Sequence, residues 1–265
     1  MIGAVNRYER WTVLLEMIAE TGQLDVEETA EKLNVSTATI RRDFDALAAQ
    51  QLLTRTRGGA AAHSVSYDLP LRYKVAQHAP EKQRIGAAAA ALLTPGSTVG
   101  LNGGTTTTEV ARALAARADL SAEHRGPALT VVTNALNIAH ELVVRPHLHV
   151  VTTGGSARAQ SYELVGPVAV AMLEQVALDT AVLGVDALDL VHGASAHSEG
   201  EAAINRLIAE KAAQVVVVAD GSKLGKRAFA RICPLNRIDV LVTDSTAAPD
   251  LLTRFSEAGV RVVKV

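Results

Sequence analysis

Apolar residues recur with helical spacing in the first fifty positions and predict three short helices. In the first, over residues 10–21, they follow an i, i+3, i+4, i+7 pattern that Gly22 ends. Asp25 begins the second helix and Ser36 the third, over residues 37–49, because short polar side chains accept hydrogen bonds from the free N–H groups of a first helical turn. The apolar residues that form the buried faces are Trp11, Leu14, Leu15, Ile18, Val26, Ala30, Leu33, Ile40, Phe44 and Leu47.

After the third helix the spacing changes to the period of two that is typical of a β-strand. Leu53, Arg55 and Arg57 fall on one face of an extended segment, and the Gly-Gly pair at 58–59 predicts the turn of a hairpin. A helix-turn-helix places its last helix in the major groove of DNA, and a hairpin that follows it forms a wing. We therefore predict a winged helix-turn-helix DNA-binding domain over residues 1–62.

From residue 81 onward, strand-length apolar segments alternate with helix-length segments. This alternation predicts a mainly parallel sheet with helices on both faces, so residues 81–265 are expected to form a larger, Rossmann-like α/β domain. Between the two domains, residues 63–80 contain Pro70 and Pro80 and are predicted to be a linker. The strand candidates are residues 98–101, 129–133, 148–152, 180–184, 214–219, 238–243 and 261–265.

The composition narrows the class of protein. Hydrophobic residues make up 48% of the 265 residues but aromatic residues only 3%, so the core must be built from Ala, Val, Leu and Ile. The single cysteine, Cys233, excludes an intrachain disulfide and a cysteine-based metal site, which fits a reducing cytoplasm. No apolar stretch reaches the length of a membrane span, and no metal-ligand spacing occurs. The sequence predicts a cytoplasmic protein with no membrane partner, no metal and no other cofactor.

Only one short part of the chain has a charge pattern that favours DNA binding. The chain has 26 basic and 28 acidic residues, a net charge of −2, but residues 36–62 contain four arginines and two aspartates. Arg41 and Arg42 lie in the N-terminal half of the third helix, where a guanidinium can bond a guanine edge, whereas arginines of the wing suit phosphate groups. An ordinary solvated helix face is the alternative for an isolated Arg-Arg pair. The predicted DNA contacts are Ser36, Thr37, Thr39, Arg41, Arg42, Arg55 and Arg57.

Polar residues and glycines follow the predicted strands of the second domain. Ligands of open parallel sheets bind beyond the carboxyl ends of the strands. At residues 102–108 a strand runs into two glycines, four threonines and a helix, and the exposed N–H groups of such a turn favour a phosphate. A glycine turn with a threonine cap is the alternative. The predicted effector contacts are Asn102, Gly104, Thr105, Thr106, Asn134, Gly155, Arg158, Asp186 and Lys223.

Two stretches of the first domain resemble the DeoR family of bacterial transcriptional regulators. They are VSTATIRRD at residues 35–43, similar to the family's recognition helix, and RTRGGA at residues 55–60, similar to its wing. The resemblance covers nearly the whole chain and continues through Glu-Lys at 81–82, Gly-Thr-Thr at 104–106, Thr-Asn at 133–134, Gly-Gly at 154–155, Asp-x-Ser-Lys at 220–223 and Ile-Asp-x-x-x-Thr-Asp at 238–244.

The resemblance implies a function for both domains. It implies that the second domain senses a phosphorylated sugar or a related metabolite, with Lys223, Thr105, Thr106 and Asn134 as the best contacts. It also implies a homo-oligomer, a dimer or a tetramer, that binds a double-stranded DNA operator and represses genes of carbohydrate metabolism. The family often has Asp where this chain has Asn102, and the change removes an acceptor for a sugar hydroxyl and a negative charge near a phosphate.

Two other functions remain as alternatives. The second domain also resembles ribose-phosphate isomerases, whose Asp-x-x-Asp acid/base pair matches Asp186 and Asp189. Those enzymes continue with a Lys-Gly-Gly-Gly segment, which this chain lacks, so we predict no catalytic residues and no enzyme activity. A DNA-architectural protein without a ligand is the second alternative, and the phosphate-type loop at residues 102–108 argues against it.

Overall fold

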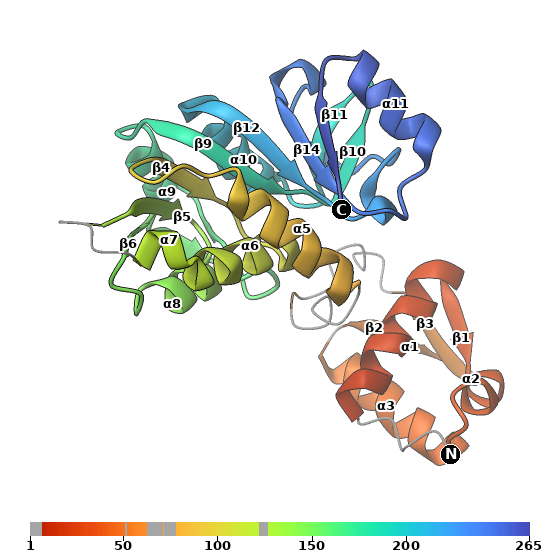
Figure 1. Cartoon of the computed structure of the whole chain (residues 1–265). Helices are drawn as coiled ribbons and strands as arrows, with labels where there is room; N and C mark the ends of the chain where they lie inside the picture. Colours follow the sequence, from red (N-terminus) through yellow and green to blue (C-terminus); the bar gives the residue numbers. More distant parts are fainter. Residues whose placement is uncertain (1–6, 51, 63–70, 72–77, 122–126) are drawn as a thin grey trace. The chain divides into compact units, whose positions relative to one another are not determined.

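The computed structural model describes residues 7–50, 52–62, 71, 78–121 and 127–265. They divide into two compact units, Met1–Gln77 and His78–Val265, and each is considered by itself (Figure 1). Most of the predicted linker, residues 63–70 and 72–77, lies outside the described residues. Helix α5 already begins at Ala79, so Pro80 lies in its first turn and not in the connecting segment.

The first unit is a winged helix-turn-helix, as predicted. Its three helices pack against a small antiparallel sheet in which β3 lies between β1 and β2. Strand β1 was not predicted, because three residues between two helices give too short a pattern to recognise. The elements are α1 (Arg7–Thr21), β1 (Gln23–Asp25), α2 (Val26–Lys32), α3 (Thr37–Ala49), β2 (Leu53–Thr56) and β3 (Gly59–Ala62).

The predicted caps of α2 and α3 are confirmed, and the wing turn differs from the prediction by one residue. The Asp25 carboxylate accepts hydrogen bonds from two N–H groups of α2, and the Ser36 hydroxyl accepts one from Thr39 N at 3.1 Å. Thr56 pairs with the first residue of β3, so Arg57 and Gly58 form the turn. The backbone of Gly58 has a φ of +94°, which favours glycine at this position.

The second unit is built on a seven-stranded sheet whose neighbouring strands are all parallel, in the order β15-β14-β12-β9-β4-β5-β6. Each predicted strand is present within two residues of its expected ends. The strands of this sheet are β4 (Thr98–Leu101), β5 (Leu129–Thr133), β6 (Leu148–Thr152), β9 (Leu178–Gly184), β12 (Ala212–Val218), β14 (Val240–Thr243) and β15 (Arg261–Lys264).

Helices cover both faces of this sheet. Successive residues of β12 alternate between two cores: Val215 and Val217 pack with apolar residues of α9, α10 and α11, whereas Val216 and Val218 pack with those of α5, α6 and α8. This three-layer arrangement explains why the strands are apolar throughout. The helices are α5 (Ala79–Ala91), α6 (Thr105–Ala116), α7 (Ala118–Ser121), α8 (Leu136–Leu142), α9 (Pro167–Leu173), α10 (Glu199–Lys211), α11 (Pro249–Glu257) and the 3-10 helices η1 (Gly221–Lys223) and η2 (Leu235–Arg237).

Two small antiparallel sheets complete the second unit and were not predicted. One is a three-stranded sheet in the order β10-β11-β13, and the other is the β7–β8 hairpin that follows β6. None of the helices within the described residues has both the length and the apolar character that a membrane crossing requires. The additional strands are β7 (Ser156–Ala157), β8 (Leu164–Val165), β10 (Ala187–Asp189), β11 (Gly193–Ala196) and β13 (Ala230–Cys233).

Candidate DNA-binding and effector sites

Helix α3 presents a basic face to solvent. Its core face, formed by Ile40, Phe44 and Leu47, is fully buried, whereas Arg41 and Arg42 are exposed. Neither guanidinium has a hydrogen bond or an ion pair with any residue that the structure describes. Two cations on the first half of a capped helix are therefore available to an anionic partner, as a recognition helix requires. The other predicted contacts on this helix, Ser36, Thr37 and Thr39, all lie within or next to its first turn.

A buried carboxylate fixes the rotation of α3. Asp43 is 3% exposed and accepts hydrogen bonds from Arg10 Nε at 2.5 Å, Arg10 Nη2 at 3.2 Å and Trp11 Nε1 at 2.7 Å. These contacts join α3 to α1 opposite the basic face. Sequence reasoning placed Asp43 in the family motif but gave it no role. An aspartate directly before the buried Phe44 was the available signal.

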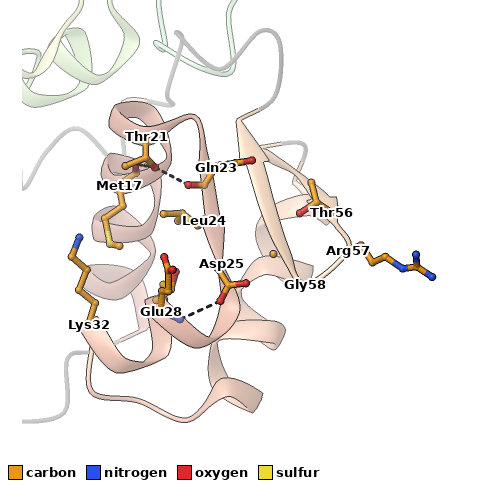
Figure 2. Close-up of a pocket in the computed structure, with 12 residues that line it drawn as sticks. Met17, Thr21, Gln23, Leu24, Asp25, Glu28, Lys32, Thr56, Arg57 and Gly58 are labelled. Atoms are coloured by element: carbon orange, nitrogen blue, oxygen red, sulfur yellow. Dashed lines mark hydrogen bonds between the residues drawn. The ribbon is translucent and has the colours of Figure 1, made fainter.

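The two wing arginines differ. Arg55 Nε lies 2.8 Å from the Asp45 carboxylate, Arg55 Nη1 donates to the Gly59 carbonyl at 2.6 Å, and the guanidinium lies over the Phe44 ring. Arg55 therefore braces the wing against α3. Arg57 is exposed in the turn, and its side chain points away from the body of the unit (Figure 2). Of the two, Arg57 is the better placed to meet a phosphate.

A pocket of about 470 Å³ lies between the end of α1, the start of α2 and the wing turn (Figure 2). Asp25 and Glu28 line it, together with Lys32. The Asp25 carboxylate accepts hydrogen bonds from backbone N–H groups of α2, which keeps it in place at the rim of the pocket. The lining also includes Arg57, so two acidic and two basic side chains surround this pocket.

In the second unit, the loop between β4 and α6 offers donors to an anion. Gly104 is the N-cap of α6, and the first N–H groups of a helix have no acceptor within it. The hydroxyls of Thr107 and Thr108 donate to the Gly104 carbonyl, at 3.2 and 2.6 Å. Within the described residues, the hydroxyls of Thr105 and Thr106 form no hydrogen bond. Gly104, Thr105 and Thr106 thus lie at the start of α6, where their backbone and hydroxyl donors suit an anion.

The side chain of Asn102 joins the ends of β4 and β9 by hydrogen bonds. It is 1% exposed, its Nδ2 donates to the Gly184 carbonyl at 2.9 Å, and its Oδ1 accepts from Gly184 N at 2.8 Å. Both polar atoms of the amide are therefore used between the ends of β4 and β9. This geometry fits a positioning role for Asn102 rather than direct contact with a ligand. Aspartate has no N–H group, so it cannot form both of these hydrogen bonds as a carboxylate.

A second buried acid lies beside the loop, and sequence reasoning missed it. Glu163 is 4% exposed, and its Oε2 accepts a hydrogen bond from Asn134 Nδ2 at 2.9 Å. Its other oxygen lies against Gly103, where a Cβ would be 2.5 Å away. Burial raises the pKa of the Glu163 carboxyl to about 8; the Glu201 carboxylate adds to the rise, and the Asn134 hydrogen bond opposes it. The available signal was an acidic residue directly before the apolar pair Leu164–Val165 of β8.

Two further predicted residues, Arg158 and Asp186, lie near Glu163, and a third, Gly155, lies against the backbone of β8. Arg158 Nε lies 2.8 Å from the Glu201 carboxylate, and Asp186 accepts a hydrogen bond from His197 N at 3.0 Å. Gly155 packs under the hairpin, where a Cβ would lie 2.6 Å from the Val165 carbonyl. The charges of Arg158 and Asp186 both act on the Glu163 carboxyl, which locates these groups near one another at the carboxyl edge of the sheet.

Lys223 is held in a rigid turn at the end of β12. The Asp220 carboxylate accepts hydrogen bonds from both the N–H and the hydroxyl of Ser222, and the Asp244 carboxylate accepts from Gly221 N at 2.8 Å. Although burial opposes it, hydrogen bonding by Thr246 and Gly221 lowers the pKa of the Asp244 carboxyl. The Lys223 ammonium is half-buried and forms no hydrogen bond or ion pair within the described part of the chain.

The aspartate pair of the isomerase alternative has structural partners. Asp189 accepts hydrogen bonds from Val191 N and His192 N, both at 2.9 Å, and lies 3.2 Å from the Arg227 guanidinium. Although burial opposes it, these partners lower the pKa of the Asp189 carboxyl. An ionised turn-forming aspartate is unsuited to the general acid role that sugar-phosphate isomerisation needs.

Two family models match this chain. The DeoR-like helix-turn-helix domain matches residues 10–65, and the DeoR C-terminal sensor domain matches residues 77–245. The chain belongs to the DeoR family. Together the two matches cover the basic face of α3, the phosphate-type loop and the Lys223 turn. This DeoR-family protein is thus a DNA-binding transcriptional regulator with a sensor domain.

Curated relatives of this DeoR-family protein align over almost their full length. The transcriptional regulator GlpR of Haloferax volcanii is 36% identical over 256 residues, which are 96% of each chain. The glycerol-3-phosphate regulon repressor of Escherichia coli K12 is 31% identical over 241 residues, covering 91% of this chain and 92% of the repressor. Among solved structures, ribose 5-phosphate isomerase A from Methanocaldococcus jannaschii aligns at 17% identity with a TM-score of 0.42, over 56% of this chain and 55% of the isomerase.

Proposed function

We propose that this protein is a cytoplasmic repressor whose affinity for a DNA operator changes when a phosphorylated sugar or related metabolite binds its second unit. The observation that carries the proposal is the pairing of two features in one chain. The first unit has unpaired, exposed arginines on a capped recognition helix, and the second has a donor-rich loop at the carboxyl edge of a parallel sheet. Glycerol 3-phosphate, which appears in a relative's name, belongs to the class of effector proposed.

Each group of residues in the proposed effector site has one role. The phosphate binds the N–H and hydroxyl groups of Thr105 and Thr106, with Lys223 as its counter-charge. The sugar or polyol part extends toward Asn134 and Arg158, while Asn102 and Gly155 shape the loop and hairpin around it. The effector changes DNA affinity only by its different affinities for the two conformations of the regulator, typically about 1–3 kcal/mol.

A homo-oligomer, a dimer or a tetramer, is part of this proposal, because two recognition helices reach successive major grooves only from two chains. Large apolar side chains support it. Phe229 is 82% and Val191 75% exposed, and the Asp189–Arg227 ion pair joins the loops that contain them. Such exposed apolar residues are suited to burial against another copy.

We expect Arg42→Ala to weaken specific DNA binding by about 5- to 150-fold, since one bidentate arginine–guanine contact contributes about 1–3 kcal/mol. The measurement is fluorescence anisotropy on DNA from beside the protein's own gene at fixed salt, because phosphate contacts make affinity strongly salt-dependent. Lys32→Ala removes the same charge from α2, outside the proposed DNA face, and serves as the control. Equal losses in both variants would contradict the assignment of α3.

We expect Lys223→Ala to weaken binding of a sugar phosphate at least tenfold while specific DNA binding persists, because the variant removes the cation proposed to meet the phosphate. Thermal shift with a panel of sugar phosphates measures this, since a ligand of the folded state raises its melting temperature. Lys226→Ala, an exposed lysine three residues away, is the matched control. An unchanged thermal shift in Lys223→Ala would show that the phosphate lies elsewhere.

A further inference from the structure

The wing turn is attached to the rest of the first unit on two sides. On one side, Val26 N at the start of α2 donates a hydrogen bond to the Gly58 carbonyl at 3.0 Å. On the other side, the Arg55 side chain reaches α3, and its Nη1 donates to the Gly59 carbonyl at 2.6 Å. Arg57 lies between these two attachments, in the turn itself. The position of Arg57 relative to α3 therefore depends on contacts that Arg55 makes.

The guanidinium of Arg55 is already bound within the unit. Its Nε lies 2.8 Å from the Asp45 carboxylate, and its Cζ lies 5.6 Å from the centre of the Phe44 ring. The Asp45 carboxylate balances the charge of the guanidinium and would also repel a phosphate that approached it. Arg55 is thus better suited to join two elements of the protein than to bind DNA directly.

The ring of Phe44 gives this joint a fixed base. Phe44 is fully buried in the core of the first unit, together with Ile40 and Leu47 of the same helix. A cation is attracted to the face of an aromatic ring, so the ring determines where on α3 the guanidinium lies. Arg55 therefore holds α3 through a buried ring and through the surface carboxylate of the next residue, Asp45.

The side chain of Arg57 has no such restraint. It is exposed, and it forms no hydrogen bond or ion pair with any residue in the described ranges. Figure 2 shows that it points away from the body of the unit. Its charge is therefore available to a phosphate, and a turn that is already held in place lowers the ordering cost of that contact.

We propose that Arg55 is a positioning residue of the DNA interface, which holds the wing turn against α3 so that Arg57 meets a phosphate while α3 lies in the major groove. The inference rests on the proposed function, in which α3 and Arg57 bind the operator. The two wing arginines thus have different roles: Arg57 neutralises a phosphate, and Arg55 acts through Arg57.

A double-mutant cycle in the full chain separates positioning from direct binding, because independent contacts contribute additively to the free energy of binding. The readout is fluorescence anisotropy at fixed salt on DNA from beside the protein's own gene. We expect Arg57→Ala to weaken specific binding about tenfold in the unmodified protein but less than twofold in the Arg55→Gln background. Glutamine keeps a donor for the Gly59 carbonyl but removes the charge that pairs with Asp45.

Arg42→Ala is the control, because Arg42 belongs to α3 and not to the wing. It should cost at least about fivefold in specific binding both in the unmodified protein and in Arg55→Gln. Arg55→Met, which keeps an apolar stem over the Phe44 ring, should reduce the effect of Arg57→Ala as Arg55→Gln does.

Each other outcome contradicts a stated part of the proposal. If Arg57→Ala still costs about tenfold in Arg55→Gln, the two losses add and Arg55 is itself a DNA contact. If Arg42→Ala also loses its effect in Arg55→Gln, Arg55 supports the whole unit and not the wing in particular. If neither Arg42→Ala nor Arg57→Ala weakens specific binding by the unmodified protein, the operator contacts of the proposed function are wrong, and this inference fails with them.

Discussion

Asp43→Ala is expected to unfold the winged helix-turn-helix unit at a much lower urea concentration than the unmodified protein needs. The variant removes the carboxylate that accepts three hydrogen bonds from Arg10 and Trp11, two of them from the largely buried guanidinium. Breaking a buried ion pair from one side costs about 3–5 kcal/mol. That is a large share of the stability of a unit of this size, about 0.05–0.15 kcal/mol per residue.

The chain provides its own probe for this experiment. Trp11 is the single tryptophan of the protein, and it lies in the first unit. Tryptophan fluorescence in a urea titration of the full chain therefore reports on the first unit, and DNA binding should be lost with it. Asp45→Ala is the control, because Asp45 is 65% exposed and its pair with Arg55 should contribute at most about 1 kcal/mol. Similar urea midpoints in Asp43→Ala and Asp45→Ala would contradict the role given to Asp43.

Glu163→Gln is expected to stabilise the second unit in a pH-dependent way. The carboxyl has a pKa of about 8 in the folded chain against an ordinary value of 4.5, so the folded state holds its proton more tightly than the unfolded chain does. Below about pH 4.5 the Glu163 carboxyl is protonated in both the folded and the unfolded chain, so its raised pKa does not lower the free energy of unfolding. As the pH rises from about 4.5 to 8, the unfolded chain alone loses the proton, and the protein loses up to about 1.4 kcal/mol of stability per pH unit.

Glutamine imitates the protonated acid but has no proton to lose, so the stability of the variant does not fall as the pH rises through this range. The melting temperatures of the two proteins, followed by circular dichroism, should be similar at pH 4.5 and separate progressively up to pH 8. The separation should reach on the order of 10 °C and then remain constant. Glu199→Gln, at an exposed position, should track the unmodified protein at every pH. A constant difference between Glu163→Gln and the unmodified protein across this range would show that Glu163 does not titrate as proposed.

Local sequence patterns were sufficient to predict the helices of the first unit and the strands of the parallel sheet. The three helices of the first unit and the seven strands of the parallel sheet follow from the spacing of apolar residues, and the caps at Asp25 and Ser36 follow from side chains that bond their own first turn. Each of these signals depends on residues within a few positions of one another. The same is true of the glycine and threonine loop before α6, whose donors belong to consecutive residues.

The roles of individual polar side chains depend on contacts between distant parts of the chain. Arg55 and Arg57 are equivalent in the sequence, but only Arg55 meets Asp45 and the Phe44 ring when the wing folds back on α3. In the sequence Asn102 resembles a ligand contact. In the structure both of its polar atoms form hydrogen bonds with Gly184, which is 82 positions away. Sequence spacing contains no information on either pairing.

The sequence by itself determined the two-unit architecture, the recognition helix and the position of the phosphate-type loop, because periodicity, caps and glycine turns are local. Only the tertiary structure decided which acids are buried and what they face. Asp43 is charged and would be expected at the surface, yet it lies against α1, and Glu163 reaches Gly103 only because a hairpin after β6 folds over the ends of β4 and β5. Burial and pairing of a charge are properties of the surroundings of a residue, and those are assembled from distant segments.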